Sequence, residues 1–212
     1  TRGLSPRRRL THDLLAYYDK VTIPDGSPLN LTHTLQLKRL VNFENQVLSL
    51  EGYVLMQWRD DQLIWDPIKY DNIRITWIPS HLLWNPDIVL ENNADQLKNK
   101  ALSDINIVVS FDGFIFYTPP VTLKSYCNVE DTDLSTYSEV KCTLKFMSWT
   151  YDGLTLNLEP GSEENILADF DDNFNHKWSL ISASVKRNER FYKCCPDTSY
   201  IDIEYNLVLK RR

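Results

Sequence analysis

Hydrophobic and polar residues alternate along most of this chain, and that alternation constrains the fold more than any other feature. The longest example places apolar side chains at Leu48, Leu50, Val54, Met56 and Trp58. A period of two is typical of strands with one buried face. Further strand-like segments lie at 105–111, 114–118, 121–126, 143–149, 154–158, 178–186 and 200–209. Turn-forming Asp-Gly, Pro-Pro and Pro-Gly pairs separate them, which predicts an all-β, immunoglobulin-like β-sandwich of about ten strands over about 29–210.

The N-terminal segment has a helical period instead. Ser5 precedes Pro6, an arrangement typical of a helix start. Apolar positions then recur at helical spacing, at Leu10, Leu14, Leu15 and Tyr18. This spacing predicts a short amphipathic α-helix over about 6–19. Because nothing that follows has the composition of a linker, we expect residues 1–212 to form one domain.

Charge and hydropathy exclude several classes of protein. The 212 residues carry a formal net charge of -6, which argues against a nucleic-acid partner because phosphate binding requires a basic face. No run of 18 apolar residues occurs, so we expect no membrane span in this chain. The first residues also lack the apolar core of a signal peptide, so a secreted protein would be present here in a processed or trimmed form.

The chain has four cysteines, Cys127, Cys142, Cys194 and Cys195. An even number indicates oxidation in a secretory compartment, and all three possible pairings stay open on spacing alone. Metal binding is a weak alternative, because no Cys-x-x-Cys or paired histidines accompany them. Asn30 begins an N-L-T sequon, which fits a secreted, extracellular glycoprotein.

No arrangement of residues indicates catalysis. The four histidines stand in unrelated contexts without a nucleophile motif, and the six glycines form no phosphate-binding loop. We therefore predict that the protein is not an enzyme and uses no cofactor. Acidic residues at 163–172 raise the alternative of a cation site, but they lack the spacing of a calcium-binding loop. A solvated loop without metal is the preferred interpretation.

The adjacent cysteines are the most informative motif. The stretch YKCCPDTSY at 192–200 resembles the ligand-capping loop of the Cys-loop family, as found in nicotinic acetylcholine receptor α subunits and acetylcholine-binding proteins. The motifs W-N-P-D at 84–87, N-N-A-D at 92–95 and S-W-T-Y-D-G at 148–153 resemble further family motifs in the same order. Cys127 and Cys142 resemble the pair that closes the family's signature loop. The resemblance covers essentially the whole chain.

The resemblance implies a fold, a pairing and a site. It implies the disulfides Cys127–Cys142 and Cys194–Cys195, although ring strain would otherwise favour more distant partners for adjacent cysteines. It also implies a homopentamer of β-sandwiches with the ligand between subunits. The principal face of that site would carry Trp149, Tyr192, Cys194, Cys195 and Tyr200, and the complementary face Trp58, Val108, Phe116 and Thr118.

These residue types suit a cationic ligand. A quaternary ammonium forms no strong hydrogen bond, so recognition depends on ring faces that attract a desolvated cation, each worth about 0.5–2 kcal/mol. The resemblance implies acetylcholine, nicotine-like agonists, antagonists and toxins as partners. The structural alternative for Trp58 and Trp149 is core packing, since both lie in strand-like segments.

Other residues are expected to support the site. The resemblance implies that Lys145 pairs with Asp202 near Tyr192, and that Asp87 orients the loop of Ser148 and Trp149. The alternative for Lys145 and Asp202 is an ordinary cross-strand ion pair, which is worth little on a surface.

Two positions depart from the family pattern. Glu91 stands where the family usually has a cage tyrosine, and losing one ring should weaken binding by about 1 kcal/mol unless the carboxylate reaches the ammonium. The loop between Cys127 and Cys142 carries a polar stretch, LSTYSEV at 134–140, where receptor subunits carry a hydrophobic F-P-F-D stretch that faces the membrane domain.

The polar stretch favours a soluble binding protein for acetylcholine and nicotinic-type cations, secreted to the extracellular space. The alternative is the isolated extracellular domain of a nicotinic ligand-gated cation channel subunit. A third interpretation, an adhesion or carbohydrate-binding sandwich, predicts neither cation binding nor a pentamer.

Overall fold

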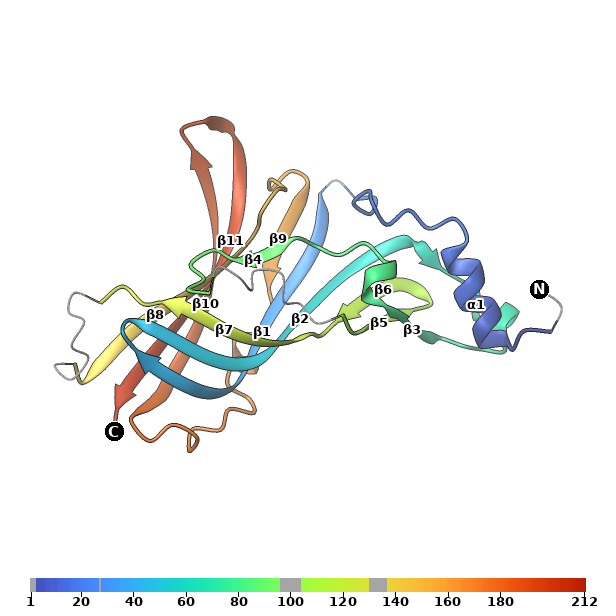
Figure 1. Cartoon of the computed structure of the whole chain (residues 1–212). Coiled ribbons are helices and arrows are strands. Elements are labelled where there is room, and N and C mark those ends of the chain that lie inside the picture. The colour runs from blue at the N-terminus through green and yellow to red at the C-terminus, as the bar shows by residue number, and fades with distance from the viewer. Residues whose placement is uncertain (1–2, 27, 96–103, 130–136) are drawn as a thin grey trace.

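The structure is a computed structural model that describes residues 3–26, 28–95, 104–129 and 137–212. Within these ranges one α-helix, α1 (Pro6–Leu15), precedes eleven β-strands. This arrangement confirms the predicted β-sandwich with a short N-terminal helix. The molecule is elongated, with α1 at one end and the C-terminus towards the other (Figure 1).

The larger sheet has seven strands in the order β3-β5-β6-β2-β1-β9, and β7 is also paired with β2. The long strand β2 pairs with β7 along its first half and with β6 along its second half. The strands are β1 (Leu29–Glu44), β2 (Val47–Ile64), β3 (Ile75–Pro79), β5 (Asn106–Ser110), β6 (Asp112–Tyr117), β7 (Pro120–Tyr126) and β9 (Leu156–Pro160).

The smaller sheet has four strands in the order β10-β11-β8-β4. They are β4 (Ile88–Leu90), β8 (Glu139–Ser148), β10 (Trp178–Tyr192) and β11 (Cys195–Arg211). The far end of the β10–β11 hairpin projects away from the body of the sandwich (Figure 1). This end of the hairpin is therefore free to meet a ligand or a neighbouring molecule.

The core lies between the two sheets and follows the alternation of the sequence. Leu35 and Leu37 of β1 and Leu144, Ile203 and Leu207 of the smaller sheet are all buried in it. Each fully buried aliphatic side chain contributes about 1.5–3 kcal/mol to stability, so this core holds the outer faces in place.

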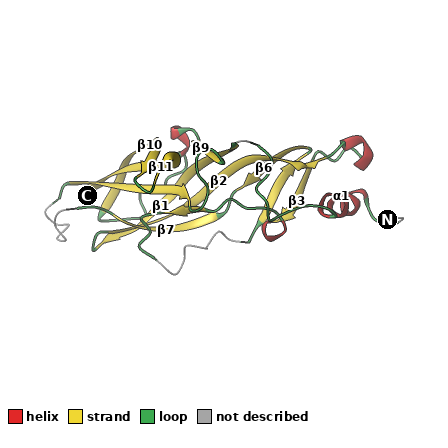
Figure 2. Ribbon diagram, turned by 90° about the horizontal axis from the view of Figure 1, so that it is seen from above, coloured by secondary structure: helices red, strands yellow, loops and turns green. Residues whose placement is uncertain are grey.

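The helix is shorter than the predicted range of 6–19, since α1 ends at Leu15. The reason is the side chain of Tyr18, whose hydroxyl donates to Asp60 Oδ2 at 2.7 Å and accepts from the Trp84 backbone N–H at 3.1 Å. These bonds attach the chain to the sandwich and draw it out of the helical path. Figure 2 shows α1 next to β3, which it contacts, at one end of the sandwich.

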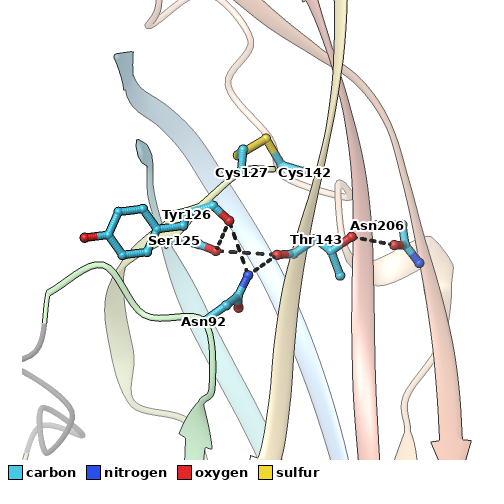
Figure 3. Close-up of a disulfide and its surroundings, with 7 residues drawn as sticks. All are labelled: Asn92, Ser125, Tyr126, Cys127, Cys142, Thr143 and Asn206. Atoms are coloured by element: carbon cyan, nitrogen blue, oxygen red, sulfur yellow. Dashed lines mark hydrogen bonds between the residues drawn. A yellow bond between two sulfur atoms is a disulfide. The ribbon is translucent and has the colours of Figure 1, made fainter. Parts of the chain in front are cut away.

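The disulfide Cys127–Cys142 is present, as the resemblance implied, and joins β8 to the chain that follows β7. Asn92 lies beside it (Figure 3), and its amide donates to the Thr143 carbonyl at 2.7 Å. Thr143 Oγ1 in turn donates to Asn206 Oδ1 of β11 at 2.9 Å. The first asparagine of the N-N-A-D motif therefore links strands. Residues 130–136, which include part of the predicted polar stretch at 134–140, lie outside the described residues.

The acidic segment at 163–172 is anchored by its own carboxylates. Asp169 accepts a hydrogen bond from Gln36, and Asp172 accepts one from Ser179. Among the described residues, no group of three or more His, Cys, Asp and Glu side chains is placed to hold a metal ion. In the same part of the chain, no helix has the length and apolar character needed to cross a membrane.

Candidate functional site

Trp149 stands at the end of β8, where the chain leaves the smaller sheet, and its side chain is 69% exposed. Asp87 fixes the backbone around it. Ser148 Oγ donates to Asp87 Oδ1 at 2.6 Å, and the Thr150 N–H donates to Oδ2 at 2.8 Å. The Trp149 N–H donates to the Asp87 carbonyl at 3.2 Å. The loop is therefore held by hydrogen bonds while the indole stays open to solvent.

Gly153 brings the same loop onto β11. Its N–H donates to the Ser199 carbonyl at 2.8 Å. A side chain at this position would place its Cβ 2.8 Å from Ser199 Oγ, closer than such atoms approach. The lack of a side chain therefore allows the Trp149 loop to lie directly against the residue that precedes Tyr200.

Tyr192 and Tyr200 face each other across the β10–β11 hairpin. Their ring centroids are 5.5 Å apart at an interplanar angle of 65°, an edge-to-face arrangement. Tyr192 is 40% exposed. Ser199 and Ile201 are buried, so the alternation of β11 directs Tyr200 to the outer face of the smaller sheet. The hairpin thus supplies Tyr192 and Tyr200, and the Gly153–Ser199 hydrogen bond holds the Trp149 loop against the strand that carries Tyr200.

Cys194 and Cys195 lie at the turn of this hairpin as two free thiols. Their sulfur atoms are 2.7 Å apart, whereas a disulfide requires about 2.05 Å. The structure leaves this pair unbonded, but the two sulfur atoms lie well within contact distance, so the Cys194–Cys195 disulfide stays a prediction. The hydrogen bond with Cys194 raises the pKa of Cys195, and the charge of the Cys195 thiolate raises the pKa of Tyr200.

Lys145 has a different partner from the predicted one. Its Nζ lies 3.7 Å from Glu91 Oε1, and the Glu91 N–H donates to the Lys145 carbonyl at 2.8 Å. The strand register places Lys145 opposite Glu204, not opposite Asp202. The predicted Lys145–Asp202 pair is therefore wrong for this structure. Lys145 pairs instead with Glu91, the carboxylate that stands where the family usually has a tyrosine.

Asp202 is instead bound by Arg190 of the neighbouring strand. The Arg190 guanidinium donates to Asp202 and, at 2.6 Å, to Glu204, while the Asn188 amide donates to Asp202 at 2.8 Å. Asp202 is buried, and hydrogen bonding to it raises the pKa of Arg190. This clasp ties β10 to β11 directly below Tyr192 and Tyr200. Arg190 was not predicted from the sequence; it stands two residues before Tyr192 and pairs directly with Tyr200 across the hairpin.

Trp58 does not lie on a ligand-accessible surface. Its side chain is 1% exposed and packs edge-on against Trp84, with ring centroids 5.8 Å apart. Val54 and Met56 share its face of β2 and are buried as well. The predicted role of Trp58 on a complementary face is therefore wrong, and core packing, the alternative interpretation, holds.

The remaining predicted residues of that face lie on the outer side of the larger sheet. Phe116 pairs with Gln57 of β2 and with Val108 of β5, and both Phe116 and Val108 are half-buried. Thr118 is exposed just after β6. Tyr53 is the aromatic residue of β2 on this outer face, and the Lys38 ammonium lies 5.1 Å from its ring centroid. The role of Tyr53 could have been predicted from the sequence, because the odd-numbered residues of β2 point to the opposite face of the sheet from Trp58.

The arrangement matches a known family. Residues 7–212 match the model of the neurotransmitter-gated ion-channel ligand binding domain. The chain is 37% identical over 99% of its length to acetylcholine receptor subunit alpha-1-B of Xenopus laevis, of which it covers 46%. It is 34% identical to acetylcholine receptor subunit alpha of Danio rerio and 32% identical to an acetylcholine receptor subunit alpha-like protein of Manduca sexta. These matches span 96% and 99% of the chain and 45% and 42% of the relatives.

The chain thus spans less than half the length of these relatives. They are receptor subunits and not enzymes, in agreement with the sequence prediction. The aromatic residues Trp149, Tyr192 and Tyr200, the Asp87-anchored loop, the disulfide and the match over residues 7–212 lead to one conclusion: the chain belongs to the neurotransmitter-gated ion-channel ligand-binding domain family.

Proposed function

We propose that this protein binds acetylcholine and similar organic cations in an aromatic cage between two copies of the chain, within a homopentamer. The observation that carries the proposal is the set of Trp149, Tyr192 and Tyr200 on two adjoining segments, the loop after β8 and the β10–β11 hairpin, with Trp149 69% exposed and Tyr192 40% exposed. Exposed aromatic rings on an ordered loop and a hairpin attract a desolvated ammonium group.

The charges below the trio also favour a cation. Glu91, Asp202 and Glu204 provide three carboxylates, whereas Lys145 and Arg190 provide two positive charges. These five side chains together carry one net negative charge, and Asp87, which holds the Trp149 loop, adds another. A cationic ligand would balance this charge, and an anionic ligand would be repelled.

A second subunit completes the site in this proposal. The inner faces of the two sheets pack against each other, so their outer faces point in opposite directions. Phe116, Val108 and Thr118 on the larger sheet are therefore turned away from Trp149 of the same chain. A neighbouring copy would bring these residues, together with Tyr53 in place of Trp58, against the trio.

The β10–β11 hairpin would act as a lid. It projects from the sandwich and carries Tyr192, Cys194, Cys195 and Tyr200 (Figure 1). Closing it over a bound cation would exclude water from the rings, which strengthens their attraction for the charge. The Arg190–Asp202 clasp marks the base of the moving part.

We place this function outside the cell, with Asn30 as a glycosylation site. Asn30 is exposed on β1, and its Oδ1 accepts a hydrogen bond from Asn157 at 2.8 Å. A loss of mass after treatment of the secreted protein with an N-glycosidase would establish the modification. An unchanged mass that equals the polypeptide mass would exclude it.

Two settings suit this binding site. The polar stretch at 134–140 favours a binding protein that works without a channel. The greater length of the relatives favours the ligand-binding part of an acetylcholine-gated channel subunit. The full-length transcript distinguishes them, since membrane-spanning segments after residue 212 would establish the channel and a stop codon would establish the binding protein.

The proposal is tested with a matched pair of ligands. Acetylcholine and 3,3-dimethylbutyl acetate have the same shape, but a carbon atom replaces the charged nitrogen in the second. Three rings at about 0.5–2 kcal/mol each predict that acetylcholine binds at least tenfold more tightly than its neutral analogue, as measured by calorimetry. Light scattering should give the protein a mass of about five times 24.9 kDa. Equal affinities, or a monomer that binds neither ligand, would contradict it.

A further inference from the structure

A second candidate binding site lies inside the sandwich, around the buried His33 of β1. Its imidazole is 0% exposed and stacks near Phe146, with ring centroids 4.6 Å apart. Its Nδ1 lies 2.9 Å from Tyr205 Oη, and the Tyr205 hydroxyl lies 2.8 Å from the His33 carbonyl oxygen. The cage proposed above uses neither His33 nor Tyr205.

These two contacts determine which imidazole nitrogen carries the proton. The phenol of Tyr205 has a single proton, and it donates this proton to the His33 carbonyl. Tyr205 Oη is therefore the acceptor in its contact with Nδ1, so Nδ1 carries the hydrogen of the neutral imidazole. Nε2 must then present a bare lone pair. Burial lowers the pKa of His33 to about 3, so the ring stays neutral near pH 7.

His33 Nε2 is buried and has no hydrogen-bond partner among the described residues. Buried polar atoms are almost always paired, so a lone acceptor of this kind marks a place where a ligand or a water molecule can donate. The neighbouring space makes this possible, because His33 lines a cavity of about 90 Å³. This volume has room for several water molecules.

The walls of the cavity favour a molecule with an apolar body. The buried part of the lining is aliphatic or aromatic apart from His33, with Val54, Met56, Leu90, Leu123 and Phe146. Water in such a space finds few of the two to four partners that it needs. A small molecule with one hydrogen-bond donor and a short hydrocarbon chain fits both the acceptor and the walls.

The outer part of the cavity is polar and leads towards solvent. Thr122 and Lys124 are exposed there, and Lys124 Nζ lies 3.6 Å from Asp95 Oδ2. This surface ion pair is weak enough to open for an entering molecule. A cation would have to give up its hydration without a buried carboxylate to replace it, so a neutral ligand is favoured.

We propose that this cavity binds a small neutral alcohol of about the size of propanol, which donates its O–H to His33 Nε2 and packs its carbon chain against Met56, Leu123 and Phe146. The site lies within one subunit and does not depend on the aromatic cage.

The first test is a crystal of the whole protein soaked with 2-bromoethanol, whose bromine is located by anomalous scattering. The expected result is a bromine peak in the cavity with the hydroxyl within hydrogen-bond distance of His33 Nε2. Peaks at the surface alone, as for an adventitious additive only, would overturn the proposal. So would ordered water in the cavity without bromine.

The second test measures binding in solution. Propanol is titrated into protein with ¹⁵N-labelled histidine, following the Nε2 resonance of His33. The expected result is a saturable shift that 1-chloropropane, which has a similar shape without the donor, produces only at concentrations at least tenfold higher. Equal responses to both compounds, or no saturation, would contradict the role of His33.

A variant completes the test. His33→Phe keeps an aromatic ring between Phe146 and Tyr205, so it is expected to fold, and thermal unfolding checks this. Propanol affinity, measured by calorimetry, should fall at least tenfold in this variant. Leu123→Phe is the second variant, because it keeps His33 but fills the cavity, and it should also abolish binding. Unchanged affinity in either folded variant would overturn the proposal.

Discussion

Two aromatic clusters of this protein have similar chemistry and opposite surroundings. Trp58 and Trp84 pack edge-on at 5.8 Å in the core, and Tyr192 and Tyr200 pack edge-to-face at 5.5 Å on the hairpin. Trp149 is 69% exposed, whereas Trp58 is 1% exposed. Ring geometry therefore does not distinguish a structural cluster from a binding cluster. Solvent exposure on an anchored loop distinguishes them, because a ligand can reach only a ring that is not buried in the core.

The chain connects the two clusters at the W-N-P-D motif. Trp84 lies in the core against Trp58 and near Tyr151, with ring centroids 6.4 Å apart in the second pair. Asp87, three residues later, holds the Trp149 loop from below. The segment 84–87 therefore supports both the buried Trp58–Trp84 cluster and the exposed Trp149 loop. Substitutions in the buried cluster should lower stability, whereas substitutions in the exposed cluster should weaken binding.

The largest effect is expected for Trp58→Ala. Removing a fully buried indole leaves a cavity in the core and should lower the free energy of unfolding by about 3–5 kcal/mol. Urea unfolding measures this change. Trp149→Ala is the matched control, because its exposed side chain should alter stability by about 0.5 kcal/mol or less. Equal losses in the two variants would remove the distinction between the clusters.

The buried aromatic residues also predict a pH dependence of stability. His33 has a pKa of about 3 in the folded protein, below the ordinary value of 6.5, because burial disfavours its charged form. The unfolded chain therefore binds the proton more readily. The stabilisation by neutral His33 is complete well above pH 6.5 and is lost as the pH falls towards 3, by about 1.5 kcal/mol between pH 6.5 and 5.

The measurement is the free energy of unfolding of wild type and His33→Phe at several pH values, with the other titrating groups common to both. The difference between the two proteins should change in favour of the variant as the pH falls from 6.5 to 5. Parallel pH profiles would show that His33 is not held neutral by burial. Tyr205, whose pKa is raised by burial, stays uncharged throughout this range.

On the exposed side, Trp149→Ala should weaken acetylcholine binding by about tenfold to thirtyfold. This range corresponds to the loss of one strong cation–π contact of about 1.4–2 kcal/mol. Calorimetry measures the change. Phe174→Ala is the control, since this ring is also exposed but stacks on Arg39 outside the proposed site. A similar loss of affinity in both variants would argue against a specific cage.

The smallest effect is expected for Glu91→Tyr, which restores the ring that the family usually has. It should tighten acetylcholine binding several-fold, by about 1 kcal/mol or less. Glu91→Gln removes the charge and its pairing with Lys145 without adding a ring, so it isolates the contribution of the ring. No gain for Glu91→Tyr relative to Glu91→Gln would show that position 91 points away from the ligand.

The fold was predictable because it depends on local patterns. Alternation identified the strands, and the motif at 192–200 located the hairpin that carries Tyr192 and Tyr200. Trp58 was placed wrongly because the assignment relied on residue type, although Met56 and Val54 on the same face already marked that side of β2 as buried. Applying the alternation strictly would have selected Tyr53.

The errors in the ion pairs have a different origin. Whether Lys145 meets Glu91 or Asp202 depends on the register of β4, β8 and β11 and on competition from Arg190. Such long-range pairing is not encoded in any short segment. The end of α1 was missed for the same reason, because Tyr18 is held by Asp60, 42 residues away in the chain.

Titration with acetylcholine, followed by tryptophan fluorescence, distinguishes a Trp149 that forms the binding surface from a Trp58 that supports the core. Wild type and Trp149→Phe are compared at equal concentration. A saturable change in emission is expected in the wild type, and this change should be largely lost in Trp149→Phe. A change of equal amplitude in both proteins, or none in the wild type, would contradict it.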